Sequence, residues 1–434
     1  MWIVFFCFFL CIGCIGNDTN SETAVDKDST IYAYSVDDYD IETANNAFAF
    51  DMYSHLIKEE NLVFSPYSIF TAMAVCYDGA ESTTQEEIAY VFNYPLNKPV
   101  LEKSSKKMMN IFNSDDENYD LKTANALWVR KEYPLNQQFV QNSKNYYEAN
   151  VTNLDFRGEQ EKSRVIINDW VASKTNDKIK DLLPEDLITQ DTAIIITNAV
   201  YFKGKWMNEF DVANTEKRTF HNSSSNENGT SVDMMYIQEH FSYGEGESAK
   251  IVELPYKGND LCMYIVLPEE NNIEEFESTF TLSGYNKLKS SMESQYPVRV
   301  WLPRFKIDTK AELPDTLKDM GIVDAFDGNR ANFSGIYDVQ IVPEDYKLWL
   351  DDVVHQAFID VQEEGTEAAA STAIEAVDSA EEVPEKVLEF KADHPFMFFI
   401  EDKRTGCILF MGKVEDPGSS VTPGNATEIK NNEE

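Results

Sequence analysis

Positively charged side chains are scarce in this sequence. Its 434 residues include 37 Lys and Arg against 76 Asp and Glu, which gives a formal net charge of −39. A surface of this sign repels the phosphates of nucleic acids and of anionic lipids, so we expect no nucleic-acid partner. The densest basic group, Lys103, Lys106 and Lys107, is interpreted as the solvated face of a helix.

Histidine and the common catalytic motifs are also rare. No G-x-S-x-G elbow, P-loop or H-E-x-x-H motif occurs. The five histidines are not spaced as metal ligands; they are His55, His221, His240, His355 and His394. We therefore expect no enzyme, no metal and no other cofactor. From the residues alone, His355 is interpreted as a core histidine with satisfied hydrogen bonds.

Apolar runs of membrane-spanning length are absent, and the N-terminus carries a shorter one. The run Trp2–Gly13 is apolar and uncharged but too short to span a bilayer, so residues 1–14 are predicted to be an export signal. Cys14 resembles the lipid-bearing cysteine of a prokaryotic lipoprotein. Residues 15–37 are polar and predict a flexible tether. We expect an extracellular or cell-surface protein, attached to the membrane only through such a lipid.

Cysteine is too sparse for a disulfide framework. Three of the six cysteines fall in the predicted signal. The remaining three, Cys76, Cys262 and Cys407, are far apart and each lies in an apolar run. They are predicted to be buried free thiols.

The rest of the chain predicts one domain over 38–417 and a polar tail over 418–434. Apolar positions between Ala47 and Ile57 share one helix face. Later segments are typical of strands, so the sequence favours an α+β class over regular βαβ units. The expected strands are Ala193–Lys203, Lys250–Pro255, Leu261–Pro268 and Tyr296–Thr309, with a last hairpin formed by Pro395–Ile400 and Cys407–Val414.

The segment 363–379 has two interpretations. Its alanine content favours an exposed helix. Read with a period of two, it is instead a strand with one small, uncharged face and one face that carries both of its acids. The small face consists of Thr366, Ala368, Ala370, Thr372, Ile374 and Ala376.

This segment and three others, in the same order along the chain, resemble the motifs of the serpin family. The sequence Glu-Glu-Gly-Thr-Glu-Ala-Ala-Ala at 363–370 is similar to the hinge of inhibitory serpins. The other three segments are Asn61–Ile69, Thr197–Trp206 and Ala392–Ile400. The resemblance covers roughly 36–417, nearly all of the predicted mature chain.

The resemblance implies a serpin fold: a large central mixed β-sheet, two further sheets, surrounding helices and an exposed reactive-centre loop at about 363–389. It also implies a suicide-substrate inhibitor of serine proteases. The protease forms an acyl-enzyme with the loop, and the cleaved loop then inserts into the central sheet and distorts the bound protease. The implied hinge residues are Glu363, Glu364, Gly365, Thr366, Glu367, Ala368, Ala369 and Ala370.

The resemblance also assigns residues that support the opening of the sheet. Beneath the central strands it places Ser65, Ser68, Asn198 and His355, as a polar network that can re-pair. Near the entry of the loop it places Trp206, Arg304 and Glu363. We predict an ion pair between Glu363 and Arg304.

The resemblance also implies which bond the protease cleaves, because the family usually has a fixed number of residues between the hinge glycine and that bond. Fourteen residues beyond Gly365, the count puts Ser379 before the bond and Ala380 after it. Because the stretch from Ser379 to Pro395 is a few residues longer than usual, Asp378, Ala380 or Val383 also remain candidates for the residue before the bond. Small residues there favour an elastase-like or subtilisin-like protease, whereas Asp378 would favour an Asp-specific one.

The partner implied is thus a serine protease, bound covalently by a monomer. The main alternative is a non-inhibitory serpin that acts as a carrier, a chaperone or a surface binding module. Such a protein would be expected to have bulky, charged or proline residues on the inserting face, and this face has none of them.

Overall fold

The computed structural model describes residues 39–56, 61–112, 118–222, 229–342, 347–366 and 386–418. Several predicted features lie outside these residues. They are the export signal with Cys14, the tether, the polar tail, the hinge residues Glu367, Ala368, Ala369 and Ala370, and the bond between Ser379 and Ala380.

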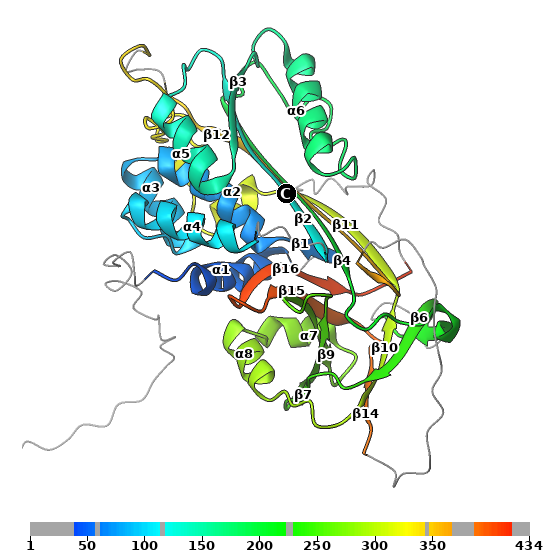
Figure 1. The fold of residues 1–434 in the computed structure, drawn as a ribbon. Coiled ribbons are helices and arrows are strands. Elements are labelled where there is room, and N and C mark those ends of the chain that lie inside the picture. The colour runs from blue at the N-terminus through cyan, green and yellow to red at the C-terminus, as the bar shows by residue number, and fades with distance from the viewer. Residues whose placement is uncertain are drawn as a thin grey trace, which may run out of the picture.

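The largest structural feature is a six-stranded central sheet with both parallel and antiparallel neighbours (Figure 1). In spatial order its strands are β11 (Phe305–Glu312), β12 (Leu350–Gln362), β13 (Gly365–Thr366), β4 (Ile194–Lys205), β2 (Tyr119–Arg130) and β3 (Asn150–Leu154). The pairs β12–β4 and β2–β3 are parallel, and the other neighbours are antiparallel.

Two further sheets complete the described part. The second sheet has the order β1 (Leu62–Phe64), β16 (Cys407–Val414), β15 (Phe396–Asp402), β9 (Leu261–Pro268), β8 (Ala249–Pro255) and β7 (Tyr243–Glu245). The third has the order β14 (Leu388–Lys391), β10 (Val298–Pro303), β6 (Thr230–Glu239) and β5 (Glu216–Phe220). The predicted α+β class with a central sheet and two more sheets is confirmed.

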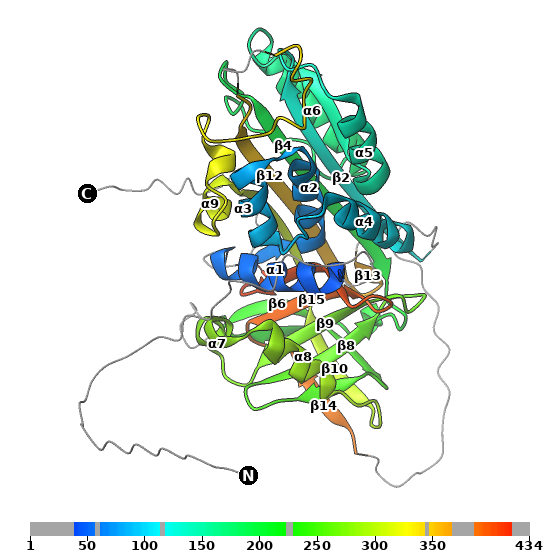
Figure 2. The same cartoon turned by 90° about the vertical axis from the view of Figure 1, so that its left-hand side faces the viewer.

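Helices cover both faces of the central sheet. The described α-helices are α1 (Ile41–Leu56), α2 (Pro66–Gly79), α3 (Ser82–Phe92), α4 (Lys98–Phe112), α5 (Gln137–Tyr147), α6 (Gln160–Lys174), α7 (Ile273–Thr279), α8 (Leu282–Ser290) and α9 (Pro314–Asp319). Figure 1 shows α2 to α5 on one side of the sheet and α6 on the other, and Figure 2 shows α1 to α4 in front of it.

Strand alternation produces two apolar cores. Side chains on one face of β4, such as Ile196 and Val200, join the main core with α2 and the second sheet. Side chains on the other face, such as Ile195 and Ala199, pack beneath α6 with Trp128. Because successive strand residues point to opposite faces, β4 has to be apolar on both sides, as a covered central strand requires.

Most predicted elements are present, with one correction. The predicted strand Tyr296–Thr309 is two strands, β10 and β11, which belong to different sheets. The chain changes sheet at Arg304, whose N–H donates to the carbonyl of Asp233 at 2.9 Å. An uninterrupted β-type pattern cannot reveal such a change, because both halves alternate in the same way.

Two further predictions are confirmed, and one helix begins earlier than predicted. The early helix begins at Ile41, before the apolar run that predicted it. Cys76, Cys262 and Cys407 are buried free thiols, as predicted. Lys103, Lys106 and Lys107 are exposed on α4, also as predicted. Of the helices in the described ranges, none combines the length and apolarity needed to cross a membrane.

Candidate functional site

The hinge begins as a short strand inside the central sheet. After β12 the chain turns at Glu363 and Glu364, and β13 returns antiparallel to both β12 and β4. Further along, β12 and β4 pair directly, from Leu350 opposite Ile194 to Phe358 opposite Tyr201. The two central strands are therefore parted at one end, by a strand of two residues, and closed over the rest of their length.

Glycine is required at the first position of this strand. Gly365 has φ +148°, in the region that favours glycine, and a Cβ there would come within 2.7 Å of the Lys205 Cα. The next residue, Thr366, is fully buried, and its hydroxyl lies 2.8 Å from the hydroxyl of Tyr256. The start of the hinge thus fits closely between its neighbours.

Trp206 holds the turn that precedes this strand. Its indole Nε1–H donates to the carbonyl of Gln362 at 2.9 Å, and its backbone N–H donates to the carbonyl of Glu364 at 3.0 Å. The indole also stacks on Tyr256, with ring centroids 4.6 Å apart. Backbone and side chain together fix the turn on both sides of Glu363.

Glu363 and Arg304 form the predicted ion pair. The Nε of Arg304 lies 2.8 Å from both carboxylate oxygens of Glu363, and the Nη2 of Arg304 lies 2.6 Å from Oε1. Thr215 donates a further hydrogen bond to Oε1 at 2.5 Å. Burial alone would raise the pKa of Glu363, but the bonds from Arg304 and Thr215 outweigh it, so the pKa is lowered.

A buried chain of polar groups runs beneath the central strands. The N–H of Ser65 donates to Nε2 of His355 at 3.2 Å, so the histidine carries its proton on Nδ1 and donates it to Oδ1 of Asn198. The amide of Asn198 then donates to Oδ1 of Asn125. This chain connects the start of α2 to β12, β4 and β2.

The histidine in this chain is neutral. His355 is fully buried, and burial lowers its pKa to about 3. A neutral imidazole can accept from Ser65 and donate to Asn198 at the same time, as both contacts require. The interpretation of His355 as a satisfied core histidine and its assignment to the polar network are compatible.

Two serines begin the helix beneath the sheet. Ser65 is the N-cap of α2: its hydroxyl accepts from the N–H of Ser68 at 3.2 Å and donates to the carbonyl of Leu409 at 2.6 Å. Ser68 takes part through its backbone. The cap therefore joins α2 to β16 as well as to β12.

The structure adds three residues that the sequence had not singled out. They are Asn125 at the end of the polar chain, Tyr256 against Thr366, and Thr215 against Glu363. An amide within the apolar half of a central strand could have indicated Asn125. Tyr256 and Thr215 carry no comparable signal, because their partners lie 110 and 148 residues away.

The polar chain crosses from β12 to β4, the two strands that β13 parts at one end. Throughout the described ranges, no three His, Cys, Asp or Glu side chains are grouped to hold a metal ion. The polar chain spans β12 and β4, which would have to separate for a further strand to enter between them. Its amides and imidazole can exchange hydrogen-bond partners. A further strand could follow β13 between β12 and β4 with main-chain hydrogen bonds on both sides.

Comparisons with known proteins agree with this fold. A family model described as Serpin (serine protease inhibitor) matches residues 43–417. An uncharacterized serpin-like protein of Methanosarcina acetivorans is 54% identical over 424 residues, covering 96% of this chain and 97% of that protein.

Two solved structures illustrate the range of similar proteins. Serpin48 of the insect Tenebrio molitor, described as highly specific, has a TM-score of 0.75 at 31% identity and covers 87% of this chain and 98% of its own. Human thyroxine-binding globulin, solved with thyroxine, has a TM-score of 0.77 at 26% identity and covers 87% of this chain and 99% of its own.

Proposed function

The chain belongs to the serpin family, and we propose that it inhibits serine proteases as a suicide substrate. The family consists of protease inhibitors rather than enzymes, so no residue of this chain is given a catalytic role. In the proposed mechanism the serine hydroxyl of the protease attacks the backbone carbonyl carbon of the loop residue that precedes the cleaved bond. The peptide bond breaks, the new amine leaves with a proton, and an ester joins the two proteins.

The observation that carries this proposal is the position of β13. Gly365 and Thr366 pair with Lys205 and Gly204 on one side and with Gln362 and Val361 on the other. A strand that continued from Thr366 would keep this register and pass between β12 and β4. The alternate residues that would face the main core with Thr366 are the small ones, Ala368 to Ala376.

Insertion on this path would release substantial free energy. A strand from Thr366 to Ser379 would be about 45 Å long at ~3.3 Å per residue. If about ten main-chain hydrogen bonds form at ~0.5–1.5 kcal/mol each, the gain is on the order of 10 kcal/mol. That gain would drive the separation of β12 from β4, and it would move the bound protease before the ester is hydrolysed.

For the cleaved bond we propose Ser379–Ala380, with an elastase-like or subtilisin-like protease as the target. The support is the sequence: the residues at the bond are small, and no Lys or Arg lies between Gly365 and Pro384. Cleavage after Asp378 by an Asp-specific protease is the alternative at this site.

Mixing the purified protein with a panel of serine proteases tests the proposal. The panel contains elastase-like, subtilisin-like, trypsin-like and Asp/Glu-specific enzymes, and each mixture is boiled in detergent and separated by size. We expect a covalent complex with an elastase-like or subtilisin-like enzyme and a released C-terminal peptide that begins at Ala380. A peptide beginning at Ser379 would instead select Asp378. Cleavage of the loop by every enzyme without a complex would contradict inhibition.

A carrier function is the second candidate. It is supported by the similarity to thyroxine-binding globulin, which was solved with a bound small molecule. The two functions predict different products: a carrier would be cleaved in the loop without forming the covalent complex.

For localisation we propose export, with residues 1–14 as the signal and Cys14 as the lipid-bearing residue. The supporting observation is the short apolar run Trp2–Gly13, which Cys14 directly follows. Mass spectrometry of the mature N-terminus tests it. An N-terminal diacylated Cys14 is expected, and a mature chain that retains Met1 would contradict export.

A further inference from the structure

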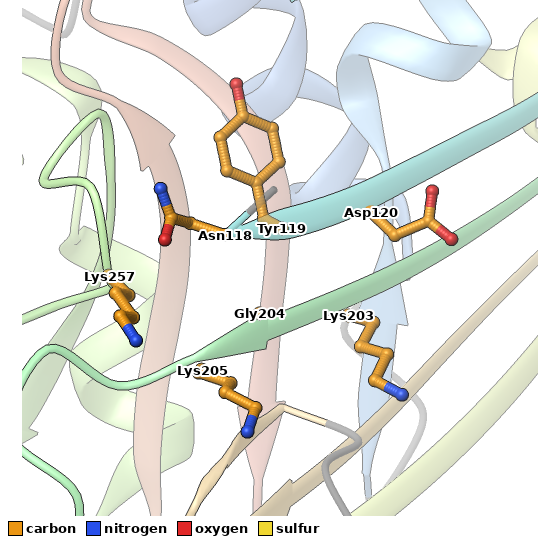
Figure 3. Close-up of a pocket in the computed structure, with 7 residues that line it drawn as sticks. All are labelled: Asn118, Tyr119, Asp120, Lys203, Gly204, Lys205 and Lys257. Carbon is orange, nitrogen blue, oxygen red and sulfur yellow. The ribbon is translucent and has the colours of Figure 1, made fainter. Parts of the chain in front are cut away.

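A hollow of about 490 Å³ lies at the end of the central sheet, beside the strand that holds the hinge. It is lined by the start of β2, the end of β4 and the turn after β8, and its charged lining residues are Asp120, Lys203, Lys205 and Lys257. Figure 3 shows the side chains of Lys203 and Lys205 extending to one side of β4, whereas Lys257 and the ring of Tyr119 lie on the other side of the strand. We call this feature the lysine hollow.

Among the described residues, the lysines of the hollow have no acidic partners. In the described ranges no salt bridge involves Lys203, Lys205 or Lys257, although two of them, Lys203 and Lys205, are half-buried. This is unusual for a chain in which carboxylates outnumber basic side chains by 76 to 37.

The nearby carboxylates are already paired with other cations. Asp120, which lines the hollow, lies 2.8 Å from Lys122. Before the turn that carries Lys257, Glu253 pairs with Lys403, and after it Asp260 pairs with Arg404 at 2.8 Å. The hollow therefore has a local excess of positive charge that the described residues do not neutralise. Charged groups withdrawn from water without a partner favour a bound counter-charge.

The backbone fixes the positions of these lysines. The N–H of Lys257 donates to the carbonyl of Lys205 at 2.7 Å, and the N–H of Met207 donates to the carbonyl of Pro255 at 2.9 Å. Lys203 and Lys205 point to one face because they are two residues apart in a strand. Gly204 between them points to the opposite face, where a Cβ would come within 2.9 Å of the Tyr256 ring. The backbone positions of the three lysines are thus held by β4 and by the hydrogen bonds of the turn, which lowers the entropic cost of binding an anion.

We propose that the lysine hollow binds a small multivalent oxyanion of the phosphate- or sulfate-ester class. The three ammonium groups that line the hollow offer point charges and several N–H donors to such a ligand. The volume of the hollow falls in the range of small-molecule sites. The net charge of the whole protein opposes binding only at long range. At physiological ionic strength the Debye length is about 8 Å, so the adjacent lysines dominate.

Isothermal titration of the full-length protein at constant ionic strength tests this proposal. Inorganic tripolyphosphate is the phosphate probe, and a trisulfated disaccharide is the sulfate probe. We expect saturable binding of at least one probe to a single site, and the tighter of the two identifies the source of the anion. The double variant Lys205→Gln/Lys257→Gln is expected to bind at least ten-fold more weakly.

Two control variants separate the hollow from general charge effects. Lys162→Gln removes a positive charge from the exposed side of α6, where Lys162 pairs with Glu159 at 2.7 Å, and should bind the probe like the unchanged protein. Lys205→Arg/Lys257→Arg keeps the charge and should retain most of the affinity. Absence of saturable binding, or an equal loss in Lys162→Gln and in the hollow variant, would overturn the proposal.

Discussion

Arg304 and Glu363 form an ion pair that joins the third sheet to the hinge turn. Arg304 stands where the chain leaves β10 for β11, and Glu363 stands where it leaves β12 for β13. Only 4% of the Glu363 side chain is exposed, against 39% of the Arg304 side chain. The carboxylate therefore depends on this partner, whereas the guanidinium retains contact with water.

Glu363→Gln is expected to destabilise the protein. It leaves the bonds from Arg304 without a charged acceptor at a nearly buried position, and since Arg304 is partly hydrated we expect a loss of about 1–2 kcal/mol. Denaturant unfolding at neutral pH measures the loss. The control is Glu161→Gln, which removes a carboxylate paired with Arg164 but 67% exposed, and is expected to cost less than about 0.5 kcal/mol. Equal losses in both variants would contradict the anchoring role.

Asp78 makes stability depend on pH in the neutral range. Its carboxylate is buried, and burial, with the charge of Glu102 adding to it, raises its pKa to about 8, although Tyr147 and Lys98 act in the opposite direction. Because the folded state holds this proton more tightly than the unfolded state, whose pKa is about 4, proton binding favours folding. This contribution to the free energy of unfolding is complete below about pH 4 and is lost as pH rises through 8.

We therefore expect Asp78→Asn to stabilise the protein increasingly between pH 5 and pH 8. The gain should reach at least ~1 kcal/mol at the upper end, because the variant does not have to bury a charge. Unfolding free energies of both proteins across this range provide the test. A difference that stays constant with pH would show that Asp78 does not titrate there.

His355 has the opposite pH dependence. Its folded pKa is lowered to about 3, so its contribution to stability is complete above pH 6.5 and is lost as pH falls from 6.5 towards 3. His355→Gln, which stays neutral, should lose less stability than the unchanged protein between pH 7 and pH 4. Parallel curves for the two proteins would contradict a neutral buried imidazole.

Thr366→Arg should convert an inhibitor into a substrate. Thr366 is already fully buried between β12 and β4 before cleavage, and an unpaired charge there costs several kcal/mol. The arginine would therefore force the start of the hinge out of the sheet and close the path of insertion, so we expect at least ten-fold less covalent complex per loop cleaved. Thr366→Val, which keeps the shape and loses only the hydroxyl, should still form the complex. The ratio of complex to cleaved protein measures both. Unchanged complex formation by Thr366→Arg would contradict insertion.

The sequence predicted the site better than the path of the chain. The period of two from Thr366 onward predicted a strand with a small inner face, and the resemblance to the family assigned Arg304, Glu363, Asn198 and His355 to the site. Taken singly, Arg304 and Glu363 resemble ordinary surface charges and His355 an ordinary core histidine, so the family resemblance was needed to single them out.

Features that depend on tertiary packing could not be predicted. The change of sheet at Arg304 leaves the apolar alternation intact. The lysine hollow depends on a turn meeting the end of a distant strand, with Lys257 against Lys205. Contacts of this kind follow from how the sheets meet, and a local pattern carries no information about them.

The most direct test of loop insertion is the thermal stability of the protein before and after the loop alone is cut. A protease that cleaves near Ser379 without forming a complex supplies the cut form, and calorimetry compares it with the intact form. Insertion worth on the order of 10 kcal/mol should raise the unfolding temperature by roughly 10 °C or more for a domain of this size. Cut Thr366→Arg should show no rise. An unchanged or lower unfolding temperature in the cut, unmutated protein would contradict insertion, and with it the proposed mechanism of inhibition.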